Sequence, residues 1–270
     1  MSDPRPDAIR RLGDAGVGNP RLDARLLWDA AQRNPGIFES FIKRRIAREP
    51  VAYITGAKEF WSLELAVGPG VLIPRPDTET VIEEVLDRFP GSSAPLKILD
   101  LGTGSGCLLV TLLKEYPNAR GLGIDESEQA LAIAAGNIAR HGLENRADLR
   151  RGNWMDGLTE SWDVIVSNPP YIPTADIAGL EADVRDYEPR GALDGGADGL
   201  DAVRALAKAL RGTRFTAAFV EIGVGQGESA KLLMAAEGLS VHHVAADLAG
   251  IPRVLVTGPA PAAASKKELE

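Results

Sequence analysis

The sequence predicts an α/β fold: a doubly wound, mostly parallel sheet with an antiparallel C-terminal strand pair, preceded by a small helical N-terminal domain and a β-hairpin linker. From residue 96 onward, short apolar runs alternate with amphipathic helical segments, which is typical of parallel strands joined by covering helices. Before residue 51, apolar residues recur only at helical spacing. The expected units are a helical domain over 1–50, the linker over 51–76, the sheet domain over 77–257 and a disordered tail over 258–270.

Composition narrows the classes of function. The chain has 270 residues, is 44% hydrophobic and carries a net charge of −8. This acidic balance argues against binding a phosphate backbone, so we expect no direct nucleic-acid partner. One cysteine, Cys107, excludes an internal disulfide, and with three histidines it makes no metal-ligand spacing. The start lacks a signal-peptide pattern and no apolar stretch could cross a membrane, so we expect a cytoplasmic protein without membrane contact.

Three helices are expected before the linker. One covers Ala8 to Ala15, and Asn19 before Pro20 is typical of an N-cap that starts the next. The third, from about Phe38 to Arg48, has a basic face formed by Lys43, Arg44, Arg45 and Arg48. That face could be solvated, or it could dock an acidic partner.

The linker and sheet domain follow from shorter signals. Tyr53 to Gly56, Glu59 to Trp61 and Leu63 to Leu65 favour a hairpin, and Asp77 is placed to cap the next helix. Strands are then expected at 96–101, 120–124, 148–150, 164–167 and 215–222, with 239–246 and 253–257 as the antiparallel pair. Helices are expected at 107–116, 127–140 with Ser127 as cap, 199–210 and 226–236.

A glycine-rich loop between the first sheet strand and its helix predicts a cofactor site. Its third glycine comes one residue early for a dinucleotide fingerprint, and no Gly-Lys-Ser/Thr follows for a nucleotide triphosphate. Asp125, ending the second strand, is placed to bind ribose hydroxyls, although it could instead support a helix start. An acid at Asp100 would suit a ligand ammonium better than a pyrophosphate, which favours S-adenosylmethionine over NAD. The expected cofactor residues here are Asp100, Gly102, Thr103, Gly104, Ser105, Gly106 and Asp125.

Two further positions complete the expected site. Trp154 follows the third strand, where it could stack on an adenine or simply pack in its loop. Asn168-Pro169-Pro170-Tyr171 follows a buried strand, at the edge where such sheets bind ligands. The prolines remove two backbone donors, so the turn presents acceptors: the Asn168 side-chain oxygen and a backbone carbonyl. With the Tyr171 ring beside them, these suit a planar group bearing an NH2, although the tetrapeptide could also be an ordinary turn.

Taken together, these motifs resemble the protein-glutamine N5-methyltransferases that act on peptide-chain release factors. The resemblance covers about Glu49 to Thr257, and its most specific part is Ile73-Pro74-Arg75-Pro76-Asp77-Thr78-Glu79. Other matching segments are Glu49 to Gly56, Phe60-Trp61, Asp100 to Gly106, Asp125, Asn168 to Tyr171, Asp183 to Arg185, Glu188-Pro189, Asp194 to Leu200, Glu221 to Gly223, and Gln226.

The resemblance implies a Rossmann-like, class I S-adenosylmethionine-dependent methyltransferase. It implies methyl transfer to the glutamine side-chain nitrogen of the Gly-Gly-Gln motif in class-1 release factors, which modulates translation termination, with S-adenosylhomocysteine as product. It places the glycine loop, Asp125 and Trp154 at the cofactor, Asn168 at both cofactor and acceptor, and Pro169, Pro170 and Tyr171 at the acceptor amide. The helical N-terminal domain would help to dock the release factor.

Two rival functions stay open on the sequence. A nucleic-acid adenine methyltransferase can use the same turn on the exocyclic NH2 of a flipped base. The acidic composition and the lack of a base-recognition insert count against it. The other rival is a non-catalytic S-adenosylmethionine-binding protein, against which the intact turn and cofactor loop count.

Overall fold

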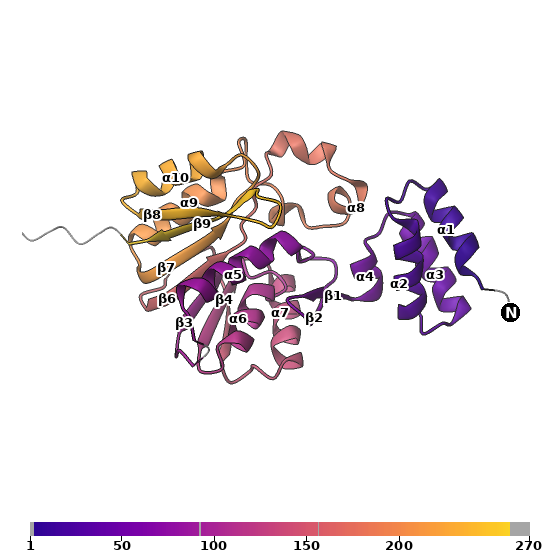
Figure 1. Ribbon diagram of the computed structural model, residues 1–270, viewed down its shortest axis with the longest axis horizontal. Helices are drawn as coiled ribbons and strands as arrows, with labels where there is room; N and C mark the ends of the chain where they lie inside the picture. The colour runs from indigo at the N-terminus through magenta and orange to yellow at the C-terminus, as the bar shows by residue number, and fades with distance from the viewer. Residues whose placement is uncertain (1–2, 92, 156, 260–270) are drawn as a thin grey trace, which may run out of the picture.

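The computed structural model describes residues 3–91, 93–155 and 157–259, and Figure 1 shows a small helical bundle beside a larger α/β body. Within these ranges, no helix has the length and apolar character needed to span a bilayer. The predicted disordered tail lies outside the described residues from residue 260 onward. The prediction of disorder is wrong at the first residue of this tail, because Gly258 ends a strand of the sheet.

The bundle consists of α1 (Arg5–Asp14), α2 (Pro20–Ala30) and α3 (Pro35–Ile46). Asn19 caps α2 as predicted, because its side chain accepts from the Leu22 amide at 3.2 Å. The third helix begins earlier than expected, since Asn34 accepts from two amides of its first turn and Pro35 follows it. The bundle has a hydrophobic core of its own, formed by Ala8, Leu12, Val17, Ala24, Leu27, Ala31, Phe38, Ile42 and Ile54.

The linker is a hairpin only in part. Its first residues form a helix, α4 (Val51–Thr55), which corrects the predicted strand at Tyr53 to Gly56. The Pro50 carbonyl accepts from the Ile54 amide at 3.0 Å, and Gly56 ends the helix at φ 76°. The hairpin itself is β1 (Ala57–Phe60) paired with β2 (Leu63–Ala66). Ile54 packs in the bundle core while the Tyr53 hydroxyl donates to the Val71 carbonyl, so α4 ties the two parts together.

The seven-stranded sheet confirms the predicted fold class. Its order is β5-β4-β3-β6-β7-β9-β8, with β9 antiparallel to both β7 and β8 and the other pairs parallel. In chain order the strands are β3 (Lys97–Leu101), β4 (Arg120–Asp125), β5 (Ala147–Arg151), β6 (Ser161–Ser167), β7 (Arg214–Glu221), β8 (Ser240–Ala246) and β9 (Pro252–Gly258).

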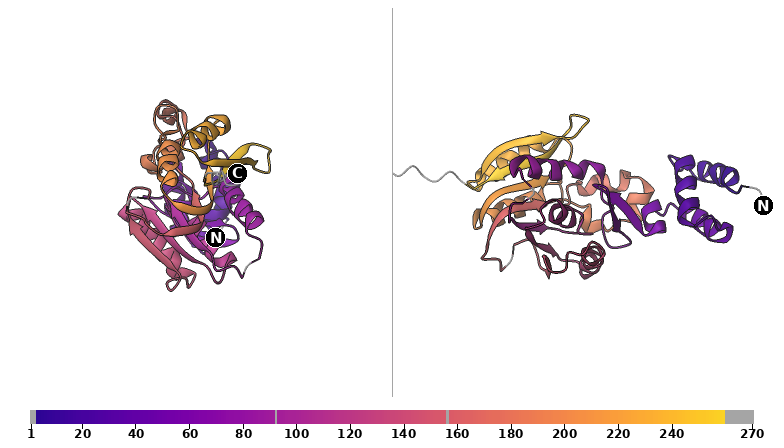
Figure 2. Two further views of the ribbon diagram at one scale, coloured as in Figure 1. Left: turned by 90° about the vertical axis from the view of Figure 1, so that its left-hand side faces the viewer. Right: turned by 60° about the horizontal axis from the view of Figure 1, so that its bottom comes forward.

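Helices cover both faces of this sheet (Figure 2). One core joins Ile98 and Val164 to α5 (Glu79–Arg88), α6 (Cys107–Glu115) and α7 (Glu128–Arg140). The opposite core joins Leu99 and Ile165 to α9 (Asp201–Arg211) and α10 (Gly227–Ala236). Neighbouring residues of β3 and of β6 thus point into different cores. These strands are therefore apolar on both faces, as buried parallel strands require.

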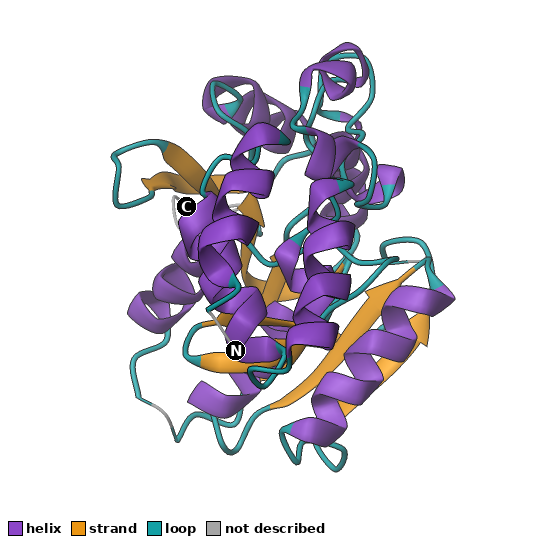
Figure 3. Cartoon of the chain, turned by 90° about the vertical axis from the view of Figure 1, so that its right-hand side faces the viewer, coloured by secondary structure: helices purple, strands orange, loops and turns teal. Residues whose placement is uncertain are grey.

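A long connection between β6 and α9 crosses the carboxyl edge of the sheet. It contains two 3-10 turns, η2 (Thr174–Gly179) and η3 (Arg190–Ala192), and the short helix α8 (Ala182–Arg185). Figure 3 views the chain from the side of the bundle, whose helices stand in front of this edge.

Most of the predicted basic face, formed by α3 and by Arg48 just after it, is engaged in ion pairs within the chain, so little of it is free to dock a partner. Arg45 Nη2 lies 2.9 Å from Asp183 Oδ2, and Arg48 donates to the other oxygen of the same carboxylate. Arg44 pairs with Glu49. In the part of the chain described, only Lys43 of the four basic residues forms no ion pair. Asp183, in α8, therefore anchors the helical bundle to the sheet domain.

Candidate active site

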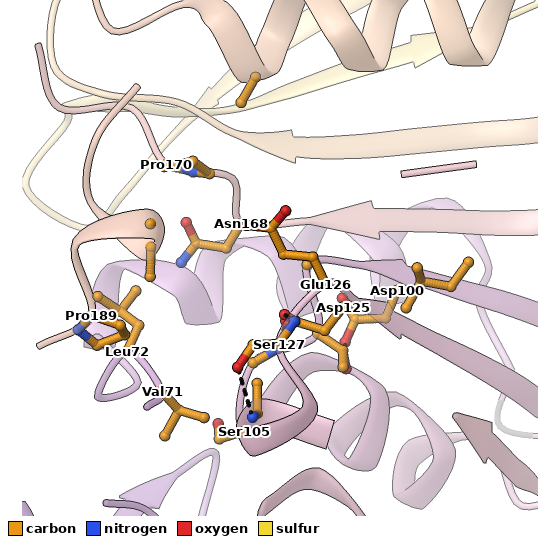
Figure 4. A pocket seen from close by; sticks show the side chains of 18 of the residues that line it. Val71, Leu72, Asp100, Ser105, Asp125, Glu126, Ser127, Asn168, Pro170 and Pro189 are labelled. Carbon is orange, nitrogen blue, oxygen red and sulfur yellow. Dashed lines mark hydrogen bonds between the residues drawn. The ribbon is translucent and has the colours of Figure 1, made fainter. Parts of the chain in front are cut away.

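A cavity of about 600 Å³ opens at the carboxyl edge of β3, β4 and β6 (Figure 4). These strands meet where the sheet order reverses, since β3 lies between β4 and β6. Ligands of open α/β sheets bind at such a reversal. Its walls come from the glycine loop, the turn after β4, the turn after β5, the Asn-Pro-Pro turn, residues 70–78 and residues 189–194.

The glycine loop forms one wall, and its backbone needs glycine. Gly102, Gly104 and Gly106 have φ of 72°, 54° and 79°, in the left-handed region that other residues rarely adopt. The Gly102 amide donates to the Ile124 carbonyl at 2.9 Å, which pins the loop to the next strand. Gly102 and Gly104 therefore bring bare backbone to the edge of the cavity, whereas Gly106 is the N-cap of α6 and is not among the lining residues.

Asp125 connects two walls of the cavity. Its Oδ2 accepts from the Gly104 amide at 2.9 Å, and its Oδ1 accepts from the Ser127 amide at 2.9 Å. Ser127, as predicted, caps α7 by accepting from the Ala130 amide. Asp125 therefore supports the helix start and also lines the cavity. The two interpretations made from the sequence are compatible.

Asp100 is a buried acid at the base of the cavity. Its side chain is 1% exposed, and Oδ2 accepts from the Thr103 hydroxyl at 2.6 Å. Burial raises the pKa of this carboxyl to about 7, against the lowering effect of the Thr103 hydrogen bond. Oδ1 has no hydrogen-bond partner among the described residues. A cationic or N–H-bearing group of a ligand would supply the missing partner.

The Asn-Pro-Pro-Tyr turn contributes only part of its predicted surface. Asn168 and Pro170 line the cavity, and in Figure 4 the Asn168 side chain extends from the end of its strand toward it. Pro169 is buried and Tyr171 half-buried, and neither is among the lining residues. The Tyr171 hydroxyl donates to Glu221 at 3.3 Å, so its ring is held behind the wall.

Trp154 lies in the turn after β5. It lines the cavity and also packs against the core that joins the sheet to α9 and α10. Packing within its loop and contact with a ligand are therefore compatible. The thiol of Cys107 lines the cavity too, and burial raises its pKa to about 12. This thiol is therefore neutral at physiological pH and is no candidate nucleophile.

Several lining residues had no role assigned from the sequence. Leu72 and Pro74 come from the end of the linker, and Pro189 comes from the connection after α8. Glu188 holds these walls together, because Oε2 accepts from the Ile73 amide at 3.0 Å and Oε1 pairs with Arg75. The Ile-Pro-Arg-Pro-Asp-Thr-Glu segment is the sequence signal that could have pointed to these residues. Its contacts with Glu188 depend on the fold and cannot be predicted from sequence spacing. No group of three or more metal-binding side chains occurs in the described parts of the chain.

Comparison with known proteins decides the family. A release factor glutamine methyltransferase from Caulobacter vibrioides is 43% identical over 91% of this chain and 92% of its own length. The chain belongs to the release factor glutamine methyltransferase family. Another such relative, from Rhodospirillum rubrum, is 43% identical over 91% of this chain and 81% of its own. The family model "Methyltransferase small domain" matches residues 80–179.

Solved structures place this release factor glutamine methyltransferase family member among methyltransferases by fold. A methyltransferase from Pyrococcus furiosus aligns with a TM-score of 0.54 over 83% of this chain and 98% of its own. Its sequence is 18% identical, so the likeness concerns the fold alone. The chain is thus a methyltransferase, and its cavity lies where this fold binds ligands.

Proposed function

We propose that this protein transfers a methyl group from S-adenosylmethionine to the side-chain nitrogen of the glutamine in the Gly-Gly-Gln motif of class-1 release factors. The observation that carries the proposal is the position of Asn168. Its Nδ2 is bound by Thr78 at 3.0 Å, which leaves Oδ1 as an acceptor at the cavity. The names of the relatives point to the same acceptor.

The cavity suits S-adenosylmethionine in charge and shape. Asp100 Oδ1, which has no partner among the described residues, would accept from its amino group, and the loop from Gly102 to Ser105 would lie along its amino-acid part, with Gly106 behind it. Asp125 would accept from the ribose hydroxyls, and Trp154 would offer its indole face to the adenine. When bound, this cofactor supplies an electrophilic methyl group on its sulfonium, and S-adenosylhomocysteine remains.

The acceptor amide needs orientation more than activation. A glutamine nitrogen is a poor nucleophile because its lone pair is delocalised, so alignment with the methyl group carries much of the acceleration. The Asn168 Oδ1 and the Pro169 carbonyl would accept from its two N–H groups and stabilise the positive charge that develops there. Pro170 would form the wall beside it. No strong base is required before transfer, since the methylated nitrogen is acidic and loses its proton readily.

The helical bundle is proposed to dock the release factor, through a different face from the one predicted. The basic residues of the bundle that form no ion pair in the described part of the chain are Arg21, Arg25, Arg33 and Lys43. Of these, Arg21 and Arg25 lie together on α2. They adjoin Leu22 and Leu26 on the same helix, which are 37% and 41% exposed. Reversing Arg21 and Arg25 to Glu should raise the Michaelis constant for the protein acceptor, while Lys43→Glu on α3 serves as a matched control. An unchanged constant at low salt would remove this face from docking.

The chief rival is methylation of an adenine in nucleic acid. The net charge of −8 opposes binding to a phosphate backbone, and we assign no direct nucleic-acid or membrane partner. Since release factors work on the ribosome, we place the reaction in the cytoplasm. Incubation with labelled cofactor, a purified release factor and, separately, RNA and DNA tests the choice. Label in the release factor supports the proposal, and label only in nucleic acid supports the rival.

A further inference from the structure

Thr78 is buried beside the proposed reacting group, and the mechanism above names it only as the partner of Asn168 Nδ2. Its side chain is 0% exposed, and it lies in the 3-10 turn Pro76–Thr78 that precedes α5. Its Oγ1 accepts from Asn168 Nδ2 at 3.0 Å across 90 residues of sequence. In the described part of the chain this is the one side-chain hydrogen bond that Asn168 makes.

A buried carboxyl also lies near the Thr78 hydroxyl. Glu221, at the end of β7, is 0% exposed, and burial raises the pKa of its carboxyl while a contact with Thr78 opposes that rise. Its Oε2 has no hydrogen-bond partner among the described residues. The Tyr171 hydroxyl donates to Oε1 of the same carboxyl. Arg253 and Asp77 are the charged residues that also act on it, and they pair with each other at 2.7 Å.

This arrangement constrains the side-chain amide of Asn168. A hydroxyl has one proton, and when that proton points to Glu221 only the lone pairs of Thr78 face Asn168. The amide must then present its NH2 to Thr78, which turns Oδ1 away from Thr78. Without that bias the terminal torsion of an asparagine is broad and roughly two-fold, and the flipped amide is also accessible. A flipped Asn168 would turn its own NH2 toward the NH2 of the glutamine that is to be methylated. Two N–H donors cannot form a hydrogen bond with each other.

We propose that Thr78 is a positioning residue that holds the amide of Asn168 in the orientation in which Nδ2 faces Thr78 and Oδ1 faces the acceptor. This inference rests on the proposed function for its effect on the reaction. The orientation itself is a property of the protein alone. Thr78 touches neither the methyl group nor the acceptor in this account, and it acts only through Asn168.

The test compares Thr78→Val, which keeps the shape and removes the hydroxyl, with Thr78→Ser, which keeps the hydroxyl. Thr78→Val should lower kcat for a release factor roughly tenfold, the loss expected for one neutral hydrogen bond. The dissociation constant of S-adenosylhomocysteine should change less than twofold, and Thr78→Ser should restore most of kcat. A Thr78→Val enzyme with wild-type kcat, or an equal loss in both variants, would overturn the inference.

A second measurement does not depend on the reaction. The side-chain NH2 resonances of Asn168, assigned by their loss in Asn168→Ala, report its hydrogen bond directly. They should shift and exchange faster with solvent in Thr78→Val and stay near their wild-type values in Thr78→Ser. Unchanged resonances in Thr78→Val would refute the orientation even if the wild-type enzyme is active. Failure of the wild-type enzyme to methylate any release factor, with the shift present, would instead refute the proposed function.

Discussion

Replacing Asn168 by Ala separates binding from chemistry in the proposed mechanism. The change removes Oδ1, the acceptor at the reacting nitrogen, and leaves the Thr78 hydroxyl without its 3.0 Å donor. Loss of one group that stabilises charge in a transition state costs about 10²–10³ in kcat, or about 2.7–4 kcal/mol. Apart from Asn168 itself, the proposed cofactor residues lie on β3, the glycine loop, β4 and the turn after β5, and none of them shares a hydrogen bond with Asn168 in the described residues. Cofactor affinity should therefore fall much less than turnover.

Steady-state methylation of a purified release factor measures kcat, and calorimetry with S-adenosylhomocysteine measures the affinity for the cofactor product. Asn145→Ala is the matched control, because Asn145 is exposed in the turn before β5, at the other end of that strand from the residues that line the cavity. An Asn168→Ala enzyme with near-normal kcat would remove the residue from its proposed role. A cofactor affinity that falls as steeply as kcat would show a binding defect instead.

Three further outcomes follow from the contacts. Asp125→Ala should weaken S-adenosylmethionine binding by roughly one to two decades, as for hydrogen bonds to a charged group, and calorimetry showing unchanged affinity would contradict this. Burial raises the pKa of Glu221 to about 7, so the folded protein binds this proton more tightly than the unfolded chain does. As pH rises from about 4.5 through 7, the wild-type protein should therefore lose stability relative to Glu221→Gln. Urea unfolding should show a loss on the order of 3 kcal/mol. A pH-independent difference would contradict that sign. Asp183→Ala should leave the buried Arg45 without one partner and loosen the bundle, which limited proteolysis after α3 would detect; resistance equal to wild type would show that Asp183 is not the anchor.

The sheet was predictable because its signals are local. Each buried strand is a short apolar run, and Ser127 stands directly before a helical repeat, so the cap and the strand edges follow from neighbours in sequence. The glycine loop was equally readable, since three positive φ angles need glycine. These features place the cavity at the correct edge of the sheet before any contact is known.

The errors and omissions have a common physical cause, which is contact over long sequence distances. The run Val51 to Thr55 carries β-branched and aromatic residues, yet it is helical because Ile54 packs into the bundle and Tyr53 reaches Val71. Asp77 was expected to cap a helix but makes no capping hydrogen bond, and it pairs with Arg253 instead.

Local sequence patterns also did not predict which residues lie behind the walls of the site. Glu188 meets Ile73 over 115 residues and Tyr171 meets Glu221 over 50, so neither the cavity wall nor the buried tyrosine could be read from spacing. Arg45 and Asp183 are 138 residues apart, and the basic face of α3 consequently seemed free in the sequence. The sequence motifs identified residues that gather at one edge, whereas the orientation of each side chain depended on these distant partners.

The central claim is the identity of the acceptor. A class-1 release factor should be incubated with the protein and S-adenosylmethionine, digested, and analysed by tandem mass spectrometry of the peptide that contains Gly-Gly-Gln. The account predicts one added methyl group, located on the side chain of that glutamine and absent when Asn168→Ala replaces the wild-type protein over the same interval. An unmodified glutamine beside methylated adenine in RNA or DNA, offered at the same concentration, would contradict it.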